Sequence, residues 1–133
     1  MKEVFDKESK DALIKYRVER AFETLKEAKY NADGEFYTAA INRLYYACYY
    51  AVIALLLKYE ITAQTHSGVR SMLGLHFVSK GILSKEDGKT FHELFEKRHT
   101  GDYDDFVICD KEMVDYLYPK AERFISNISE LLK

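Results

Sequence analysis

The sequence has little of what marks linkers, disulfide frameworks and membrane spans. Its 133 residues include one proline and six glycines, so no stretch has the composition of a flexible linker. The two cysteines, Cys48 and Cys109, lie far apart and outside any CxxC or Cys/His metal spacing, so we expect buried, reduced thiols in a cytoplasmic protein. The charged stretch Met1–Lys10 lacks the apolar region of a signal peptide. The longest apolar run, Leu44–Leu57, has fourteen residues, whereas a membrane span needs about 20.

The charge balance also lacks a large excess of either sign. With a net charge of −2, the chain has no basic surplus of the kind with which proteins bind duplex nucleic acid non-specifically. A small pocket for a nucleotide or a single-stranded end is compatible with that charge. Hydrophobic residues make up 47% and charged residues 32%, which is the composition of a globular protein, and the length fits one domain over residues 1–133.

Apolar residues recur at three- and four-residue steps throughout the chain, which predicts an all-α fold without strands. The expected helices are a first one from Ile14 to Ala28, a central one over Phe36–Lys58, a third from a cap at Thr65 or Ser67 to Lys80–Gly81, a fourth capped by Ser84, and a last one from Met113 to Leu131. We expect a loop from Thr100 to Asp105. Because Pro119 lacks a backbone donor, we also expect a kink or a break near Tyr118.

The central helix has two apolar stripes and is therefore expected to be buried on most of its circumference. The first stripe consists of the small or aliphatic residues Ala40, Leu44, Ala47, Ala51 and Ala54, and the second of the bulky residues Tyr46, Tyr50, Ile53 and Leu57. The small residues would let a neighbouring helix approach closely. Each tyrosine hydroxyl needs a hydrogen-bonding partner or contact with water.

Two arginines lie on faces that should be apolar: Arg43 is in register with Tyr46, and Arg98 is in register with the apolar face of the fourth helix. A buried guanidinium needs a carboxylate, a helix C-terminus or a ligand. One interpretation is structural, with Arg98 paired to Asp102 so that the next loop is fastened to the bundle. The other is functional, a polar pocket that holds a phosphate or a base. That pocket would be lined by Arg43, Arg98, Tyr46 and Tyr103.

The histidines allow two further interpretations. His66 would lie at the start of the third helix, where N-termini attract anions, although a capping or packing role is the commoner one. His92, Glu96 and His99 share one helical face with a spacing that can hold a metal, but a solvated outer face is far commoner. We therefore predict neither a metal nor a cofactor. The sequence also has no P-loop and no Ser–His–Asp order.

Three stretches carry a family resemblance: Ala39–Ala51 (AAINRLYYACYYA), Thr65–Val69 (THSGV) continuing to Phe77–Gly81 (FVSKG), and Arg98–Tyr103 (RHTGDY). In order and spacing, across nearly the whole chain, they resemble the HEPN domain (higher eukaryotes and prokaryotes nucleotide-binding). The resemblance is strongest to small stand-alone prokaryotic HEPN proteins found beside minimal nucleotidyltransferases.

The resemblance implies a four- to five-helix, up-down antiparallel bundle that forms a homodimer. It also implies a partner nucleotidyltransferase in a toxin–antitoxin-like pair, and a site for a nucleotide or RNA. On this chain the site residues would be Arg43, Tyr46, His66, Arg98, Asp102 and Tyr103. Many HEPN proteins are metal-independent ribonucleases that use an arginine followed, after four to six residues, by a histidine. Arg98 matches that arginine, but Asp102 stands where the histidine is expected.

Three functions follow. The first is a nucleotide- or RNA-binding partner of a minimal nucleotidyltransferase, without catalysis of its own. The second is a metal-independent ribonuclease toxin with Arg98, Asp102 and His66 as catalytic residues, in which His66 supplies the imidazole if the fold brings it to Arg98. The third is a helical interaction or dimerisation module. Whether the protein is an enzyme stays open at the level of sequence.

Overall fold

The computed structural model describes residues 6–103 and 109–133, with the backbone alone for residues 99–103. Its elements are α1 (Lys7–Asp33), α2 (Tyr37–Lys58), α3 (His66–Leu73), the π-helical turn η1 (Gly74–Val78), α4 (Lys85–Tyr103) and α5 (Lys111–Leu131). These two described ranges contain no β-strand. The predicted all-α fold is therefore confirmed, and the central helix begins within one residue of its expected start.

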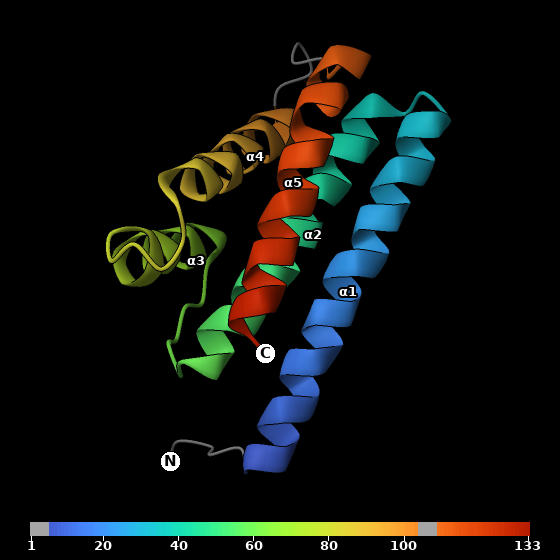
Figure 1. The fold of residues 1–133 in the computed structure, drawn as a ribbon. Coiled ribbons are helices and arrows are strands. Elements are labelled where there is room, and N and C mark those ends of the chain that lie inside the picture. Colours follow the sequence, from blue (N-terminus) through green and yellow to red (C-terminus); the bar gives the residue numbers. More distant parts are fainter. Residues whose placement is uncertain (1–5, 104–108) are drawn as a thin grey trace.

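The long helices form a bundle in which α1 runs antiparallel to α2 and α5, and α4 crosses them at an angle (Figure 1). α1 and α2 run side by side in opposite directions, and α4 and α5 cover other sides of α2. The short α3 and η1 form an arm between the end of α2 and the start of α4 (Figure 1). α2 contacts α1, α3, α4 and α5, so it is the central element that the sequence predicts.

The burial of α2 follows its two stripes. The small-residue stripe of Ala40, Leu44, Ala47, Ala51 and Ala54 is no more than 2% exposed at any position. The bulky stripe, from Tyr46 to Leu57, is half-buried. By length and composition α2 could also cross a membrane, but most of that stretch is buried inside the bundle, as in the core helix of a soluble protein. We therefore treat α2 as a core helix with one partly open face.

Side-chain caps fix the starts of α3 and α4. Thr65 Oγ1 accepts a hydrogen bond from the backbone N–H three residues later (2.8 Å), so Thr65 rather than Ser67 is the cap. Ser84 Oγ accepts from the backbone N–H of Asp87 (3.0 Å) in the same way. The Asp87 side chain is buried and accepts from Nδ2 of Asn127 (2.9 Å), which ties α4 to α5. The cap of α3 matters for function because it places His66 in the first turn of that helix.

The structure corrects two expectations about helix ends. The loop predicted from Thr100 is helical up to Tyr103, because α4 continues through that residue. A glycine within a helix costs about 1 kcal/mol relative to alanine, which does not stop a helix that is already formed from adding a turn. Residues 104 and 105 of the predicted loop lie outside the described part of the chain.

Of the two alternatives predicted near Tyr118, the break is wrong, because α5 is one uninterrupted helix across Pro119, and the kink stays a prediction. Leu117 and Ala121, on either side of the proline, are both fully buried. A proline in a helix interior costs about 3 kcal/mol. Burial of side chains on both sides of Pro119 offsets that cost by holding the two halves of α5 against the same core.

Candidate functional site

The candidate site is centred on Tyr45, which is fully buried in α2 and faces α3 and α4. Its hydroxyl oxygen lies 2.8 Å from Nδ1 of His66 in α3. Its ring stacks on Phe91 of α4, with 5.6 Å between centroids and 23° between planes. The guanidinium carbon of Arg98, also in α4, lies 5.1 Å from the centre of the same ring. Tyr45 therefore brings an imidazole and a guanidinium from two different helices to one side chain.

Further aromatic rings surround His66. The ring of Tyr49 lies 4.7 Å from the imidazole, tilted by 34°, and the ring of Tyr46 meets it edge-on at 5.8 Å. Phe95 of α4 approaches Tyr45 edge-on at 6.2 Å. We use the name Tyr45 cluster for Tyr45, Tyr46, Tyr49, His66, Phe95 and Arg98.

The direction of the Tyr45–His66 hydrogen bond depends on the tautomer of the imidazole. Burial raises the pKa of Tyr45 above its ordinary value, and the nearby Arg98 charge opposes that shift only in part. The phenol is thus protonated at neutral pH, and it donates to Nδ1 when that nitrogen carries no proton. The proton of the imidazole then sits on Nε2. In this tautomer His66 offers an N–H donor of the kind that binds a phosphate oxygen.

Arg43 extends the cluster along α2 toward α1. Its guanidinium carbon lies 5.1 Å from the centre of the Tyr46 ring, and its Nη1 lies 3.6 Å from Oε1 of Glu27. Its side chain is 31% exposed. The Tyr46 ring in turn meets the Tyr45 ring edge-on at 5.2 Å. A continuous series of contacts therefore links Arg43 to Arg98 through the two tyrosines.

The structure brings together four of the six residues predicted from the sequence: Arg43, Tyr46, His66 and Arg98. The side chains of Asp102 and Tyr103 lie outside the described residues, and so does the Arg98–Asp102 pair of the structural interpretation. Tyr46, His66 and Arg98 thus belong to the Tyr45 cluster, and Arg43 lies beside it against Tyr46.

Sequence reasoning missed Tyr45, Tyr49 and Arg70. The guanidinium carbon of Arg70 in α3 lies 4.4 Å from the centre of the Phe95 ring. Its Nη1 lies 3.4 Å from Oε1 of Glu96 and 3.2 Å from Nδ1 of His92. A signal was present, because Arg70 follows His66 by four residues and therefore shares its face of α3.

One face of α4 carries His92 and Glu96, two of the three residues whose spacing can hold a metal. The contacts of Arg70 engage both of these side chains. Over the residues whose side chains are described, no group of three or more His, Cys, Asp or Glu residues could hold a metal ion. The side chain of His99, the third member of the predicted face, is outside that part of the chain.

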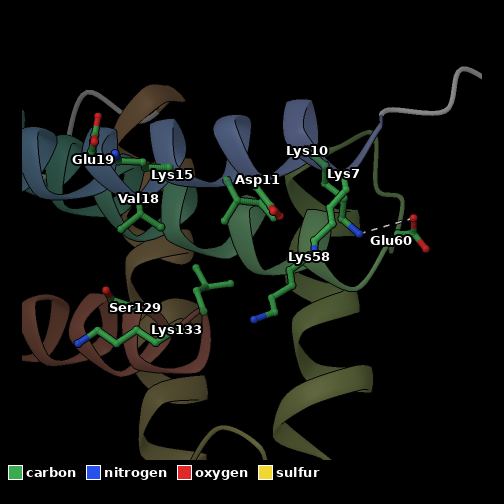
Figure 2. A pocket seen from close by; sticks show the side chains of 12 residues that line it. Lys7, Lys10, Asp11, Lys15, Val18, Glu19, Lys58, Glu60, Ser129 and Lys133 are labelled. Carbon is green, nitrogen blue, oxygen red and sulfur yellow. Dashed lines mark ion pairs between the residues drawn. The ribbon is translucent and has the colours of Figure 1, made fainter.

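One cavity lies away from the Tyr45 cluster and another lies beside it. One of about 900 Å³ opens at the end of the bundle, between the first half of α1 and the C-terminal ends of α2 and α5 (Figure 2). No residue of the Tyr45 cluster lines this cavity. Its lining includes five lysines: Lys7, Lys10, Lys15, Lys58 and Lys133. A second cavity of about 690 Å³ lies between α3, η1 and α4, and its lining includes Arg70 and His92.

Comparisons with known proteins agree with the sequence motifs. The family model of the HEPN domain matches residues 14–131. A "UPF0332 protein" of Thermotoga maritima is 40% identical over 124 residues, which cover 93% of this chain and 94% of that protein. The "Putative toxin MJ0142" of Methanocaldococcus jannaschii is 34% identical over 86% of this chain and 78% of its own length. The "Putative toxin MJ0605" of the same organism is 31% identical over 100% of this chain and 98% of its own length. The chain therefore belongs to the HEPN domain family.

Proposed function

We propose that this HEPN protein binds a nucleotide or single-stranded RNA at the Tyr45 cluster. The observation that carries the proposal is that Tyr45 contacts both His66 and Arg98. A guanidinium binds phosphate through paired N–H donors, and the Nε2–H of His66 adds a third donor. The half-buried rings of Tyr46 and Tyr49 offer faces on which a base stacks.

In the cell, we propose that the protein works beside a minimal nucleotidyltransferase in a toxin–antitoxin-like pair. Two relatives carry the word toxin in their names, which supports the toxin side of such a pair. We further propose a cytoplasmic homodimer, because both cysteines are free and buried and the bulky stripe of α2 is only half-covered. Co-purification with the product of an adjacent nucleotidyltransferase reading frame tests the partner, and light scattering of the pure protein tests the dimer.

Isothermal titration calorimetry with AMP, ATP and a short RNA tests ligand binding directly. Binding with a Kd below the millimolar range is expected for at least one of them, and Arg98→Gln should weaken it about tenfold or more because it removes a charged donor. Arg123→Gln is the matched control, since Arg123 is an exposed arginine of α5 and makes the same change in net charge. A protein that binds none of the three ligands contradicts the proposal.

A ribonuclease is the second candidate, because an imidazole accompanies Arg98 although Asp102 occupies the motif position. In metal-independent cleavage the 2′-oxygen loses its proton to a base and attacks the adjacent phosphorus, while the bond to the 5′-oxygen breaks and that oxygen takes up a proton. The products are a 2′,3′-cyclic phosphate and a 5′-hydroxyl. In its imidazolium form, His66 would give the Nε2 proton to the 5′-oxygen while its Nδ1–H donates to the Tyr45 oxygen. Arg98 would neutralise the phosphate, and Asp102 would be the base.

Incubation of RNA with the pure protein in EDTA distinguishes the two candidates. A ribonuclease yields cyclic-phosphate ends by mass spectrometry, and both His66→Ala and Arg98→Ala abolish them. Intact RNA together with unimpaired growth of the expressing cells rejects this candidate and leaves the binding function in place. If Arg98→Ala only lowers the melting temperature and changes neither binding nor cleavage, the arginine is structural and the third hypothesis, an interaction module, is favoured.

A further inference from the structure

The cavity between α3, η1 and α4, here named the α4 groove, has the size and the walls of a ligand site. Its volume is about 690 Å³, within the range of roughly 300–1,000 Å³ typical of small-molecule sites. Leu73, Val78 and Phe91 supply apolar walls. The groove is open at Gly74, where an added Cβ would meet no atom within 4 Å. An apolar body such as a base can therefore enter it.

The rim of the α4 groove is basic although the whole chain is slightly acidic. Its lining includes three basic residues, Arg70, Lys85 and Lys89, and one carboxylate, Glu93. Because Arg70 is paired with Glu96 outside the lining, the positive charge offered to a ligand comes mainly from the two lysines. Lys85 and Lys89 are exposed, lie one helical turn apart on α4, and form no ion pair with any residue of the described part. Their charges complement an anionic occupant.

One residue that lines the α4 groove, Arg70, also contacts a ring of the Tyr45 cluster. Arg70, at the edge of the groove, lies 4.4 Å from the centre of Phe95. The guanidinium carbon of Arg98, in the cluster, lies 5.9 Å from the centre of that same ring. Arg70 and Arg98, which belong to different helices, thus approach the same ring.

We propose that the α4 groove is a second nucleotide subsite, which holds another nucleotide of the strand that is bound at the Tyr45 cluster. The base lies against the apolar walls, and the phosphate lies at Lys85 and Lys89. The preferred ligand is therefore single-stranded RNA of two or more nucleotides, not a mononucleotide. This inference rests on the proposed function because it extends the same site.

The test compares a fluorescently labelled hexaadenylate, measured by anisotropy, with AMP, measured by calorimetry. The double variant Lys85→Gln/Lys89→Gln removes the two rim charges. Each lysine–phosphate contact with a single strand contributes about 0.7 to the slope of log K against log salt, which is about fivefold in affinity at roughly 0.1 M salt. The double variant should therefore bind the hexamer about 25-fold more weakly, with a slope smaller by about 1.4, and should bind AMP as the wild type does.

Two further variants separate shape from charge. Gly74→Leu places a side chain in the open part of the α4 groove and should weaken hexamer binding while the salt slope stays that of the wild type. The control Lys7→Gln/Lys15→Gln makes the same change in net charge at the bundle-end cavity of Figure 2 and should leave hexamer binding unchanged. Circular dichroism confirms that each variant is folded.

The outcomes separate the subsite from the proposed function. If the wild type binds AMP and the hexamer equally well, or if both groove variants bind the hexamer normally, the subsite is refuted and the proposed function stands. If the bundle-end control weakens the hexamer as much as the groove variant does, net charge alone is responsible and the subsite is again refuted. If the wild type binds neither ligand, both the subsite and the proposed function fail.

Discussion

Replacement of Tyr45 by phenylalanine isolates the hydrogen bond on which the candidate site depends. The ring keeps its stacking on Phe91 and its contact with Arg98, and only the hydroxyl that lies 2.8 Å from Nδ1 of His66 is lost. The net value of such a bond is about 0.5–1.5 kcal/mol, and an acceptor left unsatisfied adds to the loss. We expect the free energy of unfolding to fall by about 1–2 kcal/mol, which lowers the Tm by about 4–8 °C for a chain of this size.

Ligand binding should respond to the same change. If the phenol donates to Nδ1, its removal leaves the tautomer of His66 unfixed, so Nε2–H is no longer held as a donor. We expect the affinity for AMP to fall about tenfold, which corresponds to about 1.4 kcal/mol. Long-range ¹H–¹⁵N correlation spectra of the histidine ring check the cause, because they report which nitrogen of His66 carries the proton before and after the substitution.

Tyr46→Phe is the matched control, since the structure describes no hydrogen bond from the Tyr46 hydroxyl while its ring also contacts His66. It should change stability and AMP affinity little, within about 0.5 kcal/mol. The reasoning is refuted if Tyr45→Phe is as stable and binds AMP as tightly as the wild type. Equal losses in the two variants refute it as well, because the position of the hydroxyl would then not be the cause.

Three further predictions follow from local features. Gly74→Ala should raise the free energy of unfolding by about 0.5–1 kcal/mol, because the added Cβ meets no atom within 4 Å. Gly88→Ala should lower it, because the added Cβ would lie 3.2 Å from both methyl carbons of Val78. Urea titrations of the two variants measure the difference. Burial raises the pKa of Tyr45, so the stability that the buried phenol contributes is complete below the pKa of about 10 of an unfolded tyrosine. Above that pH the contribution is lost by up to about 1.4 kcal/mol per pH unit. Urea titrations at rising alkaline pH should therefore show a smaller loss of stability in Tyr45→Phe than in the wild type. Burial likewise raises the pKa of the Cys48 thiol, so its reaction with a thiol reagent should proceed only at the rate of unfolding, and rapid labelling of the native protein would contradict its burial.

The features that the sequence predicts best are those set by neighbours along the chain. The caps at Thr65 and Ser84 each depend on a side chain that bonds a backbone N–H three residues later. The alanine stripe of α2 depends only on helical periodicity. Such patterns lie within one or two helical turns, so the residues themselves contain the information.

The features that sequence reasoning gets wrong depend on residues far away in the chain. Pro119 does not break α5, because the buried residues on both sides are held by other helices. The importance of Tyr45 rather than Tyr46 depends on where α3 lies, since the hydroxyl bonds a residue 21 positions later. Periodicity places Tyr46 on the bulky stripe but does not indicate which tyrosine faces α3. The roles of Asp102 and Tyr103 stay predictions.

The way in which α3 is attached has a consequence for the lifetime of the site. α2 is covered by four helices, so its amide hydrogens should exchange with solvent only through global unfolding. The α3–η1 arm is held mainly by Val69, Leu73 and Phe77, so it should open locally at a lower free energy. Because His66 is the first residue of α3, every opening of the arm separates the imidazole from Tyr45. A ligand that binds only the closed arm would therefore slow amide exchange in α3 and η1 while exchange in α2 stays the same.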